Sequence, residues 1–317
     1  MSRLVLLAIA LFIGSAAAQT YPTKSIRIIV PFTPGSATDV MGRIVGERLN
    51  AAWGQPVIVD NKPGAGGSIG IREGARAEPD GYTLVLVSSG HAVNHVLYKD
   101  LGYDTLKDLS AVAMLGSLPS VLIVPPTLPV NSVKELVAML KASPGKYNYA
   151  TAGVGSGAHV SLEKFNVAAG VKAVHVPLKG TPPILAETMA GRVEYAMVPA
   201  VSGMGPVRDG KVKPLAVSTS KRVAALPNVP TLGEAGFPEG ESTFWLALLA
   251  PAKTSPEIVV RINTEVNRAL SAPDVVERLS KLGTEPMPMT PAQSDAFIAR
   301  EYHELGKIMR DAGLTPQ

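Results

Sequence analysis

Short apolar runs rich in Val, Ile and Leu alternate with segments of helical period along the first third of the chain. Runs of strand length lie at 25–30, 57–59 and 82–87, and each is followed by a turn rich in glycine or serine. Apolar residues recur at helical spacing over about 40–49 and 69–77. Regular alternation of strand, turn and helix is typical of a parallel α/β sheet.

The same organisation recurs over about 124–243, which indicates a second α/β unit. An apolar strand at 244–250 and three amphipathic helices follow it. Because segments 120–124 and 244–250 connect the two units, we expect two hinged lobes with a ligand cleft between them. The predicted division is lobe 1 at 19–123 and 244–317 and lobe 2 at 124–243, with the three-helix tail folded back on lobe 1.

The first eighteen residues have the pattern of a secretory signal peptide. Arg3 supplies a positive start, residues 4–13 are apolar, and Ala16–Ala18 match a small-residue cleavage site. The apolar run is shorter than the roughly 20 residues that a membrane-spanning helix needs. A buried N-terminal helix is the alternative interpretation. We expect signal-directed export to the periplasm, and the absence of cysteine excludes disulfides and thiolate chemistry.

The composition fits a globular protein and not a nucleic-acid binder. Hydrophobic residues make up 46% of the 317 residues and charged residues 18%, enough apolar material for a large core. The formal charge of +4 is spread along the chain, and aromatic residues are only 5%. A nucleic-acid surface would need clustered basic residues and stacking rings, so none is expected.

The turn at 31–39 is the strongest candidate for ligand binding. It joins a predicted strand to a predicted helix, with Ser36 or Thr38 as N-cap and Ser36 and Asp39 arranged like a capping box. The first N–H groups of a helix lack internal partners and its dipole favours negative charge, so the turn suits a carboxylate or a phosphate. An ordinary, well-capped strand-to-helix turn is the alternative.

Four further polar or Gly-rich turns, at 64–68, 88–91, 151–159 and 178–181, follow predicted strands and should lie at the same edge of the sheets. Together they offer backbone N–H groups and hydroxyls but few fixed charges. The candidate ligand-binding residues are Phe32, Gly35, Ser36, Ala37, Thr38, Asp39, Ala65, Gly66, Ser68, Ser88, Ser89, His91, Thr151, Gly155, Ser156, His159, Lys179, Gly180 and Thr181.

Catalytic and cofactor motifs are weak in this sequence. Residues 153–157 contain glycines and a serine in the wrong order for a nucleophile elbow, and His91 and His95 lack the Glu of a His-Glu-x-x-His metal motif. The glycines of 64–70 resemble a dinucleotide-binding turn, but they follow the second strand and no acidic residue ends the next one. We therefore expect no catalytic residue, no metal and no cofactor.

Several ordered motifs resemble the Bug family, the periplasmic solute-binding subunits of tripartite tricarboxylate transporters. The opening segment 21–39 reads Tyr-Pro-x-Lys-x-Ile-x-Ile-Ile-Val-Pro-Phe-x-Pro-Gly-x-x-x-Asp, and 59–67 reads Val-Asp-Asn-Lys-Pro-Gly-Ala-Gly-Gly. Further matches lie at 79–83, 149–156, 176–180, 226–236 and 245–251. The resemblance spans essentially the whole mature chain.

The resemblance implies a two-lobed, type II periplasmic-binding-protein fold that closes on a small organic carboxylate and delivers it to membrane permease subunits. It implies that turns 32–39 and 64–68 hold one carboxylate and that 151–159 and 178–181 meet the other end of the ligand. The protein is expected to be a monomer.

Two departures from the family pattern bear on the ligand. Ser36 stands where the family commonly has a second glycine, and Val198 stands near a position where many members carry an Asp. The missing carboxylate favours a plain carboxylate ligand over an amino acid. A periplasmic α/β enzyme acting on a carboxylated substrate and a ligand sensor for a membrane receptor are the alternative functions.

Overall fold

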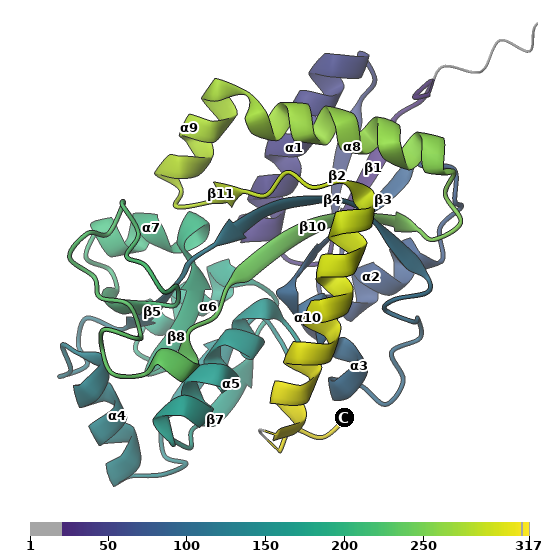
Figure 1. Cartoon of the computed structure of the whole chain (residues 1–317). Helices are drawn as coiled ribbons and strands as arrows, with labels where there is room; N and C mark the ends of the chain where they lie inside the picture. Colours follow the sequence, from purple (N-terminus) through teal and green to yellow (C-terminus); the bar gives the residue numbers. More distant parts are fainter. Residues whose placement is uncertain (1–20, 312, 317) are drawn as a thin grey trace, which may run out of the picture.

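The computed structural model describes residues 21–311 and 313–316, so the predicted signal peptide lies outside the described residues. The chain forms two mixed sheets, each covered by helices on both faces (Figure 1). The first sheet has the order β11-β4-β10-β3-β1-β2 and the second β7-β6-β8-β5-β9. These two α/β units agree with the predicted fold class.

The first sheet combines a parallel part with an antiparallel part. Its strands are β1 (Ile26–Val30), β2 (Val57–Asn61), β3 (Thr83–Ser88), β4 (Leu109–Leu118), β10 (Phe244–Pro251) and β11 (Glu285–Pro286). The predicted parallel pairing is confirmed for β1, β2 and β3. The prediction did not extend to the rest of the sheet, where β10 returns from the other lobe and runs antiparallel to both β3 and β4.

The second sheet repeats this plan. Its strands are β5 (Ser120–Val124), β6 (Asn148–Thr151), β7 (Val174–Pro177), β8 (Tyr195–Pro199) and β9 (Lys213–Val217). Strands β6, β7 and β8 are parallel, whereas β5 is antiparallel to β8 and β9. The predicted lobe boundary at residue 123 falls inside β5, which pairs only within the second sheet.

Ten α-helices and three short 3₁₀ segments connect these strands in the described residues. Those beside the first sheet are α1 (Ala37–Trp53), η1 (Ala65–Gly67), α2 (Ser68–Ala75), η2 (Ser89–Ala92), α3 (Asn94–Leu97), α8 (Pro256–Ser271), α9 (Pro273–Lys281) and α10 (Pro291–Asp311). Those beside the second are α4 (Val133–Ala142), α5 (Gly157–Ala169), α6 (Thr181–Met189), α7 (Ala200–Arg208) and η3 (Pro238–Gly240). None of the helices in the described part of the chain has the length and apolar character needed to cross a membrane.

Alternating side chains place a hydrophobic cluster on each face of each sheet. On β1, Ile28 packs into one cluster and Ile29 into the opposite one. On β8, Tyr195 and Met197 face one side and Ala196 the other. Since all five are fully buried, each sheet is the middle layer of a three-layer lobe.

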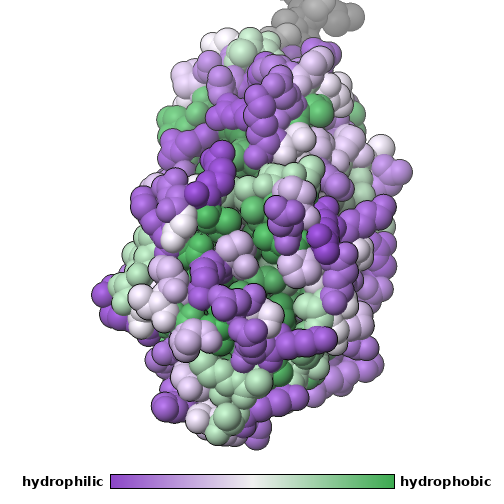
Figure 2. Space-filling view, turned by 90° about the vertical axis from the view of Figure 1, so that its left-hand side faces the viewer, coloured by the Kyte–Doolittle hydropathy of each residue, from purple (hydrophilic) through white to green (hydrophobic). Residues whose placement is uncertain are grey.

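The three C-terminal helices pack against the elements of the first sheet. Helix α8 packs beside α1, with Ile262 and Val266 in the same core cluster as Ile44. Helix α10 runs along β4 and reaches α5 of the second lobe (Figure 1). The tail therefore completes the first lobe and also touches the second. Figure 2 shows the face turned toward the left of Figure 1, where hydrophobic residues lie among hydrophilic ones near the middle.

Candidate functional site

A small cavity lies between the two lobes, where the first residues of α1, α5 and α6 meet. It is lined by Phe32, Ser36, Ala37, Thr38, Ser88, Ala152, Ser156, Gly157, Ala158, Gly180, Thr181, Pro199 and Phe244. Eight of these belong to the sequence-predicted set: Phe32, Ser36, Ala37, Thr38, Ser88, Ser156, Gly180 and Thr181. The structure thus brings together residues from four of the five predicted turns, and we call this cavity the cleft site.

The N-terminus of α1 forms one wall of the cleft site. Ser36 occupies the N-cap position, but its side chain makes no capping hydrogen bond. The capping-box expectation is therefore wrong: the Asp39 carboxylate accepts instead from the N–H of Gly35, at 2.9 Å. Among the described residues, the N–H groups of Ala37 and Thr38 have no acceptor. The Oγ1 of Thr38 is buried and also lacks a partner, so these donors remain for a ligand.

Asp39 stabilises this turn through hydrogen bonds and does not line the cavity. Besides Gly35, it accepts from Arg43, at 2.9 and 3.0 Å, and from Asn61 at 3.0 Å. Burial alone would raise the pKa of Asp39, but the hydrogen bonds from Arg43, Gly35 and Asn61 outweigh it and lower the pKa. The carboxylate is ionised and fully engaged at neutral pH, and Gly35 is held in its left-handed conformation (φ 81°).

The N-terminus of α5 faces α1 from the other lobe. Ser156 is the N-cap, and its Oγ accepts from the N–H of His159 at 3.2 Å. The ring Nδ1 of His159 accepts from the N–H of Gly155 at 3.2 Å, which fixes the preceding turn. Burial, and then the neighbouring His175, lower the pKa of His159 to about 3, so the ring is neutral. The N–H groups of Gly157 and Ala158 have no acceptor among the described residues.

The N-terminus of α6 is the third helix end at the cleft site. Thr181 is 5% exposed and follows Gly180, the N-cap. The side chain of Lys179 is exposed and lies outside the cavity, while its carbonyl accepts from the N–H of Thr33 across the lobes at 3.2 Å. None of the described residues that line the cleft site carries a charge. Its electrostatics therefore depend on the positive ends of three helix dipoles.

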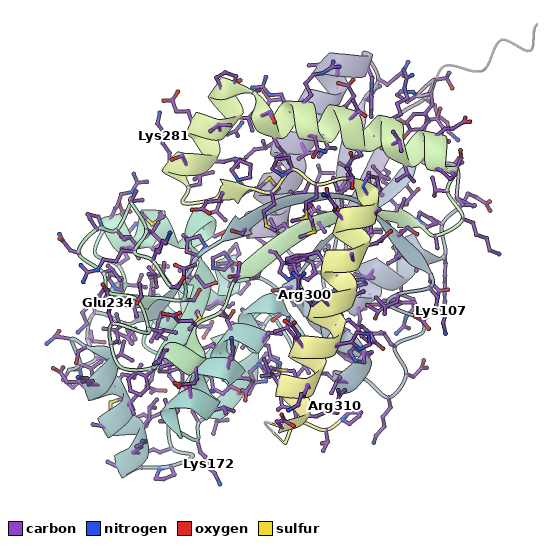
Figure 3. The ribbon with its side chains drawn as sticks, viewed as in Figure 1. Lys107, Lys172, Glu234, Lys281, Arg300 and Arg310 are labelled. Atoms are coloured by element: carbon purple, nitrogen blue, oxygen red, sulfur yellow. The ribbon has the colours of Figure 1, made fainter. Side chains whose placement is uncertain are left out.

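Many charged side chains lie on the outside of the molecule. The six that Figure 3 labels come from both lobes and are all exposed: Lys107, Lys172, Glu234, Lys281, Arg300 and Arg310. No group of three or more His, Cys, Asp or Glu in the described residues is placed to hold a metal ion. His91 and His95 each stack on a tyrosine, Tyr103 and Tyr302 respectively.

Five lining residues were not among the predicted binding residues: Ala152, Gly157, Ala158, Pro199 and Phe244. The first three lie within the predicted turn 151–159, whereas the other two lie outside every predicted turn. Pro199 ends β8 at the carboxyl edge of the second sheet, where ligands bind in α/β folds, and this rule could have identified it. Phe244 begins the returning strand β10, and Phe32 belongs to the opposite turn. No local motif distinguishes Phe244 from core residues of the same strand.

The remaining predicted residues surround the cavity without lining it. Ala65 and Gly66 form η1 with left-handed backbone, and Ser68 begins α2. Ser89 and Gly155 lie in the segments beside the cleft, and the Oγ1 of Thr151 lies 2.6 Å from the Nε2 of His175. The ring of His91 lines a different cavity, beneath α10.

Direct contacts between the lobes surround the cleft site. The hydroxyl of Tyr98 donates to the carbonyl of Val154 at 2.7 Å, and that of Ser202 to the carbonyl of Gly35 at 3.1 Å. Gly66 lies so close to Val154 that a Cβ added to it would sit 2.8 Å from the carbonyl carbon. Glycine at position 66 is thus required for this close approach, whereas the sequence suggested that it exposes its N–H to a ligand.

Comparisons with known proteins identify the family of the chain. A family model described as "Tripartite tricarboxylate transporter family receptor" matches residues 41–314. Protein BugT of Bordetella pertussis is 39% identical, over 99% of this chain and 98% of BugT.

Three solved structures are similar over more than nine tenths of the chain. The periplasmic binding protein BugD has a TM-score of 0.90 at 30% identity, covering 94% of this chain and 100% of BugD. An R. palustris protein with adipate has a TM-score of 0.90 at 32% identity, with coverage of 94% and 100%. MatC from Rhodopseudomonas palustris, with bound malate, has a TM-score of 0.87 at 32% identity, with coverage of 91% and 99%. The chain therefore belongs to the receptor family of tripartite tricarboxylate transporters and has the fold of its periplasmic binding proteins.

Proposed function

We propose that this protein is an exported receptor that closes its two lobes on a small dicarboxylate and delivers it to membrane permease subunits. The observation that carries the proposal is the meeting of three helix N-termini at one cavity whose walls bear no charge. Unpaired N–H groups at such ends bind anions, and the helix dipole adds a favourable potential. A dicarboxylate at the cleft site can receive hydrogen bonds from α1 at one end and from α5 at the other.

The residues that line the cleft site favour a ligand with carboxylate groups only over an amino acid. No carboxylate lines the cleft site in the described residues, so an ammonium group on the ligand would lack an ionic partner. Val198, near the position where relatives often have an Asp, is fully buried in β8. Phe32 and Phe244 supply apolar area for the methylenes of a ligand. The similar structures with adipate and malate support the same ligand class.

Binding requires the lobes to separate and close again. The cleft site leaves only about 20 Å³ for the centres of water-sized atoms, which is room for about one water molecule. A dicarboxylate is several times larger than this. We infer that the ligand enters an open form and that closure brings α1 and α5 to its two ends.

Export and transport complete the proposal. The signal-peptide pattern at residues 1–18 and the membership in a receptor family of periplasmic binding proteins support a periplasmic location. We propose that the mature receptor acts as a monomer and that permease subunits of a tripartite transporter accept its ligand. Loss of uptake of the identified ligand after deletion of neighbouring permease genes would test this partnership.

The ligand is tested by thermal unfolding of residues 19–317 after a cycle of unfolding and refolding that removes copurified ligand. Mono-, di- and tricarboxylates, amino acids and nucleotides are compared. A ligand at about 100 times its Kd adds about 2.7 kcal/mol of stability, a rise of several degrees for a protein of this size. A rise confined to dicarboxylates supports the proposal. A rise with nucleotides and none with acids would contradict it.

A further inference from the structure

A fully buried side chain of the first lobe reaches across to the second lobe beside the cleft site. Asn94, the first residue of α3, is 0% exposed. Its amide nitrogen donates to the carbonyl of Gly155 in the second lobe at 3.1 Å, and to that of Gly90 in its own lobe at 3.2 Å. The reverse orientation would set the amide oxygen against both carbonyls, which also only accept. One side chain therefore connects a carbonyl of each lobe.

The turn before α5 is held from both lobes. The N–H of Gly155 bonds within the second lobe, to the ring of His159 at 3.2 Å. The carbonyls of Val154 and Gly155 face the first lobe, where they accept from Tyr98 and Asn94 respectively. When the lobes separate, the bond to His159 can stay intact, whereas the two carbonyl bonds are lost. The turn is therefore fully fixed only in the closed form.

Closure brings backbone atoms of the two lobes very close together at this point. A Cβ added to Gly90 would overlap the carbonyl oxygen of Gly155 and would sit 2.8 Å from the nitrogen of Gly157. A buried carbonyl without a donor costs about as much as a lost hydrogen bond. An amide NH₂ has two hydrogens and can serve two carbonyls at once. Asn94 thus removes a cost of closure that a donor with one hydrogen would remove only in part.

We propose that Asn94 is a positioning residue for ligand binding: once the lobes close, it fixes the turn before α5 and with it the free N–H groups of Gly157 and Ala158. Asn94 does not line the cleft site itself. It acts through the turn, which ends at Ser156, the N-cap of α5. The proposal rests on the proposed function, in which those N–H groups hold one carboxylate of the ligand.

Asn94→Asp tests this role with almost no change in side-chain shape. At pH 7.5 the ionised carboxylate donates nothing to the two carbonyls, so the Kd for adipate should rise at least about 100-fold relative to the unmodified protein. Burial on closure raises the pKa of an aspartate at this position, so a fall in pH protonates it and favours the closed form. The ratio of the two Kd values should therefore fall about tenfold between pH 7.5 and pH 5.5.

The native groups near this side chain keep their charge in that window. Burial lowers the pKa of His91 and His95 to about 4 and that of His159 to about 3. Burial also raises the pKa of Tyr98 to about 12 and raises that of Tyr103. Titration of the ligand cancels because variant and unmodified protein are compared at the same pH. A change in the ratio therefore reports the introduced carboxyl group.

Two more variants separate this role from general stability. Asn94→Leu has a similar size but neither donor nor charge, and should raise the Kd about 30-fold at both pH values. Asn263→Asp is the matched control, because Asn263 is 6% exposed and donates to the carbonyls of Val112 and Met289, at 2.7 and 2.8 Å, within the first lobe. It should lower stability in urea unfolding but leave the Kd within about twofold.

Closure is measured separately by the distance between two spin labels. The chain has no cysteine, so Lys107→Cys and Lys172→Cys, at exposed positions on the first and second lobes (Figure 3), carry the labels. In the Asn94→Asp protein this distance should be longer at pH 7.5 than at pH 5.5, and in the Asn263→Asp protein it should not change.

An unchanged Kd in both Asn94 variants would overturn the proposal, as would a label distance in the Asn94→Asp protein that does not depend on pH. If the unmodified protein binds no dicarboxylate, the proposed function fails, and the label distances still decide whether Asn94 holds the lobes together.

Discussion

Gly66 should control closure of the two lobes, and Gly66→Ala is the sharpest test of that role. The added Cβ would lie 2.8 Å from the carbonyl carbon of Val154 and closer still to its oxygen. Carbon atoms in contact are normally about 3.5–4.0 Å apart, so the carbonyl carbon alone requires the lobes to separate by at least about 1 Å at this point. Both opposing atoms belong to the backbone, which leaves no flexible side chain to yield.

The cost follows from the hydrogen bonds that cross between the lobes. A separation of about 1 Å takes the Tyr98–Val154, Thr33–Lys179 and Ser202–Gly35 bonds, now 2.7, 3.2 and 3.1 Å, beyond hydrogen-bonding range. Each is worth about 0.5–1.5 kcal/mol, so the closed form loses about 3 kcal/mol. The Kd for a dicarboxylate should therefore rise roughly 100-fold.

Gly54→Ala is the matched control. Gly54 has φ 65° and ψ 13°, nearly the same as the 60° and 16° of Gly66, but a Cβ there meets nothing within 4 Å. Both variants carry the same left-handed strain of about 1–2 kcal/mol, and only one obstructs closure. Calorimetric titration with malate and adipate measures the difference. Equal affinity of the two variants would refute the role of Gly66 in closure.

Three further predictions concern single side chains. Thr38→Val should weaken dicarboxylate binding by about 1 kcal/mol, roughly fivefold. It should not lower the stability of the ligand-free protein, because the Thr38 hydroxyl has no hydrogen-bond partner there. Thr38→Ser should restore binding in the same titration. Asp39→Asn should cost about 1.5–3 kcal/mol in urea unfolding at pH 7. Because the folded pKa of Asp39 is lowered, that difference should shrink as the pH falls below about 4; a constant difference would contradict the ionic role. His159 has a pKa of about 3 in the folded protein, below its value in the unfolded chain. Its contribution to the free energy of unfolding is therefore complete above about pH 6.5 and is lost as the pH falls toward 3. Between pH 7 and 5 the protein should lose about 2 kcal/mol more stability than His159→Gln, and equal losses in urea titrations would show that His159 is not the group responsible.

The sequence predicted local structure well where a pattern determined it. The strand-to-helix turns and the amphipathic C-terminal helices follow from spacing and from single residues, and the structure has both. Helix α7 was missed because Gly203, Gly205 and Pro206 weaken its helical pattern. The direction of β10 could not be predicted, because its pairing depends on where the chain re-enters the first sheet.

The site was harder to predict than the fold. The turns at 32–38 and 156–157 were found because a helix N-terminus has a local sequence pattern. The position of His91 was not found from the sequence. A shift of one residue within η2 changes the side of the segment that a ring faces. The role of Gly66 depends on a contact with Val154, which is remote in sequence. Contacts between lobes leave no local signal in either segment.

The most direct test of the central claim is an amide NMR titration of the refolded, deuterated protein with malate and with adipate. If helix N-termini hold the ligand, the largest shifts should occur at the backbone amides of Thr38 and Ala158, one on each lobe, and both should saturate at the same ligand concentration. Saturable binding that leaves both amides unshifted would contradict the account.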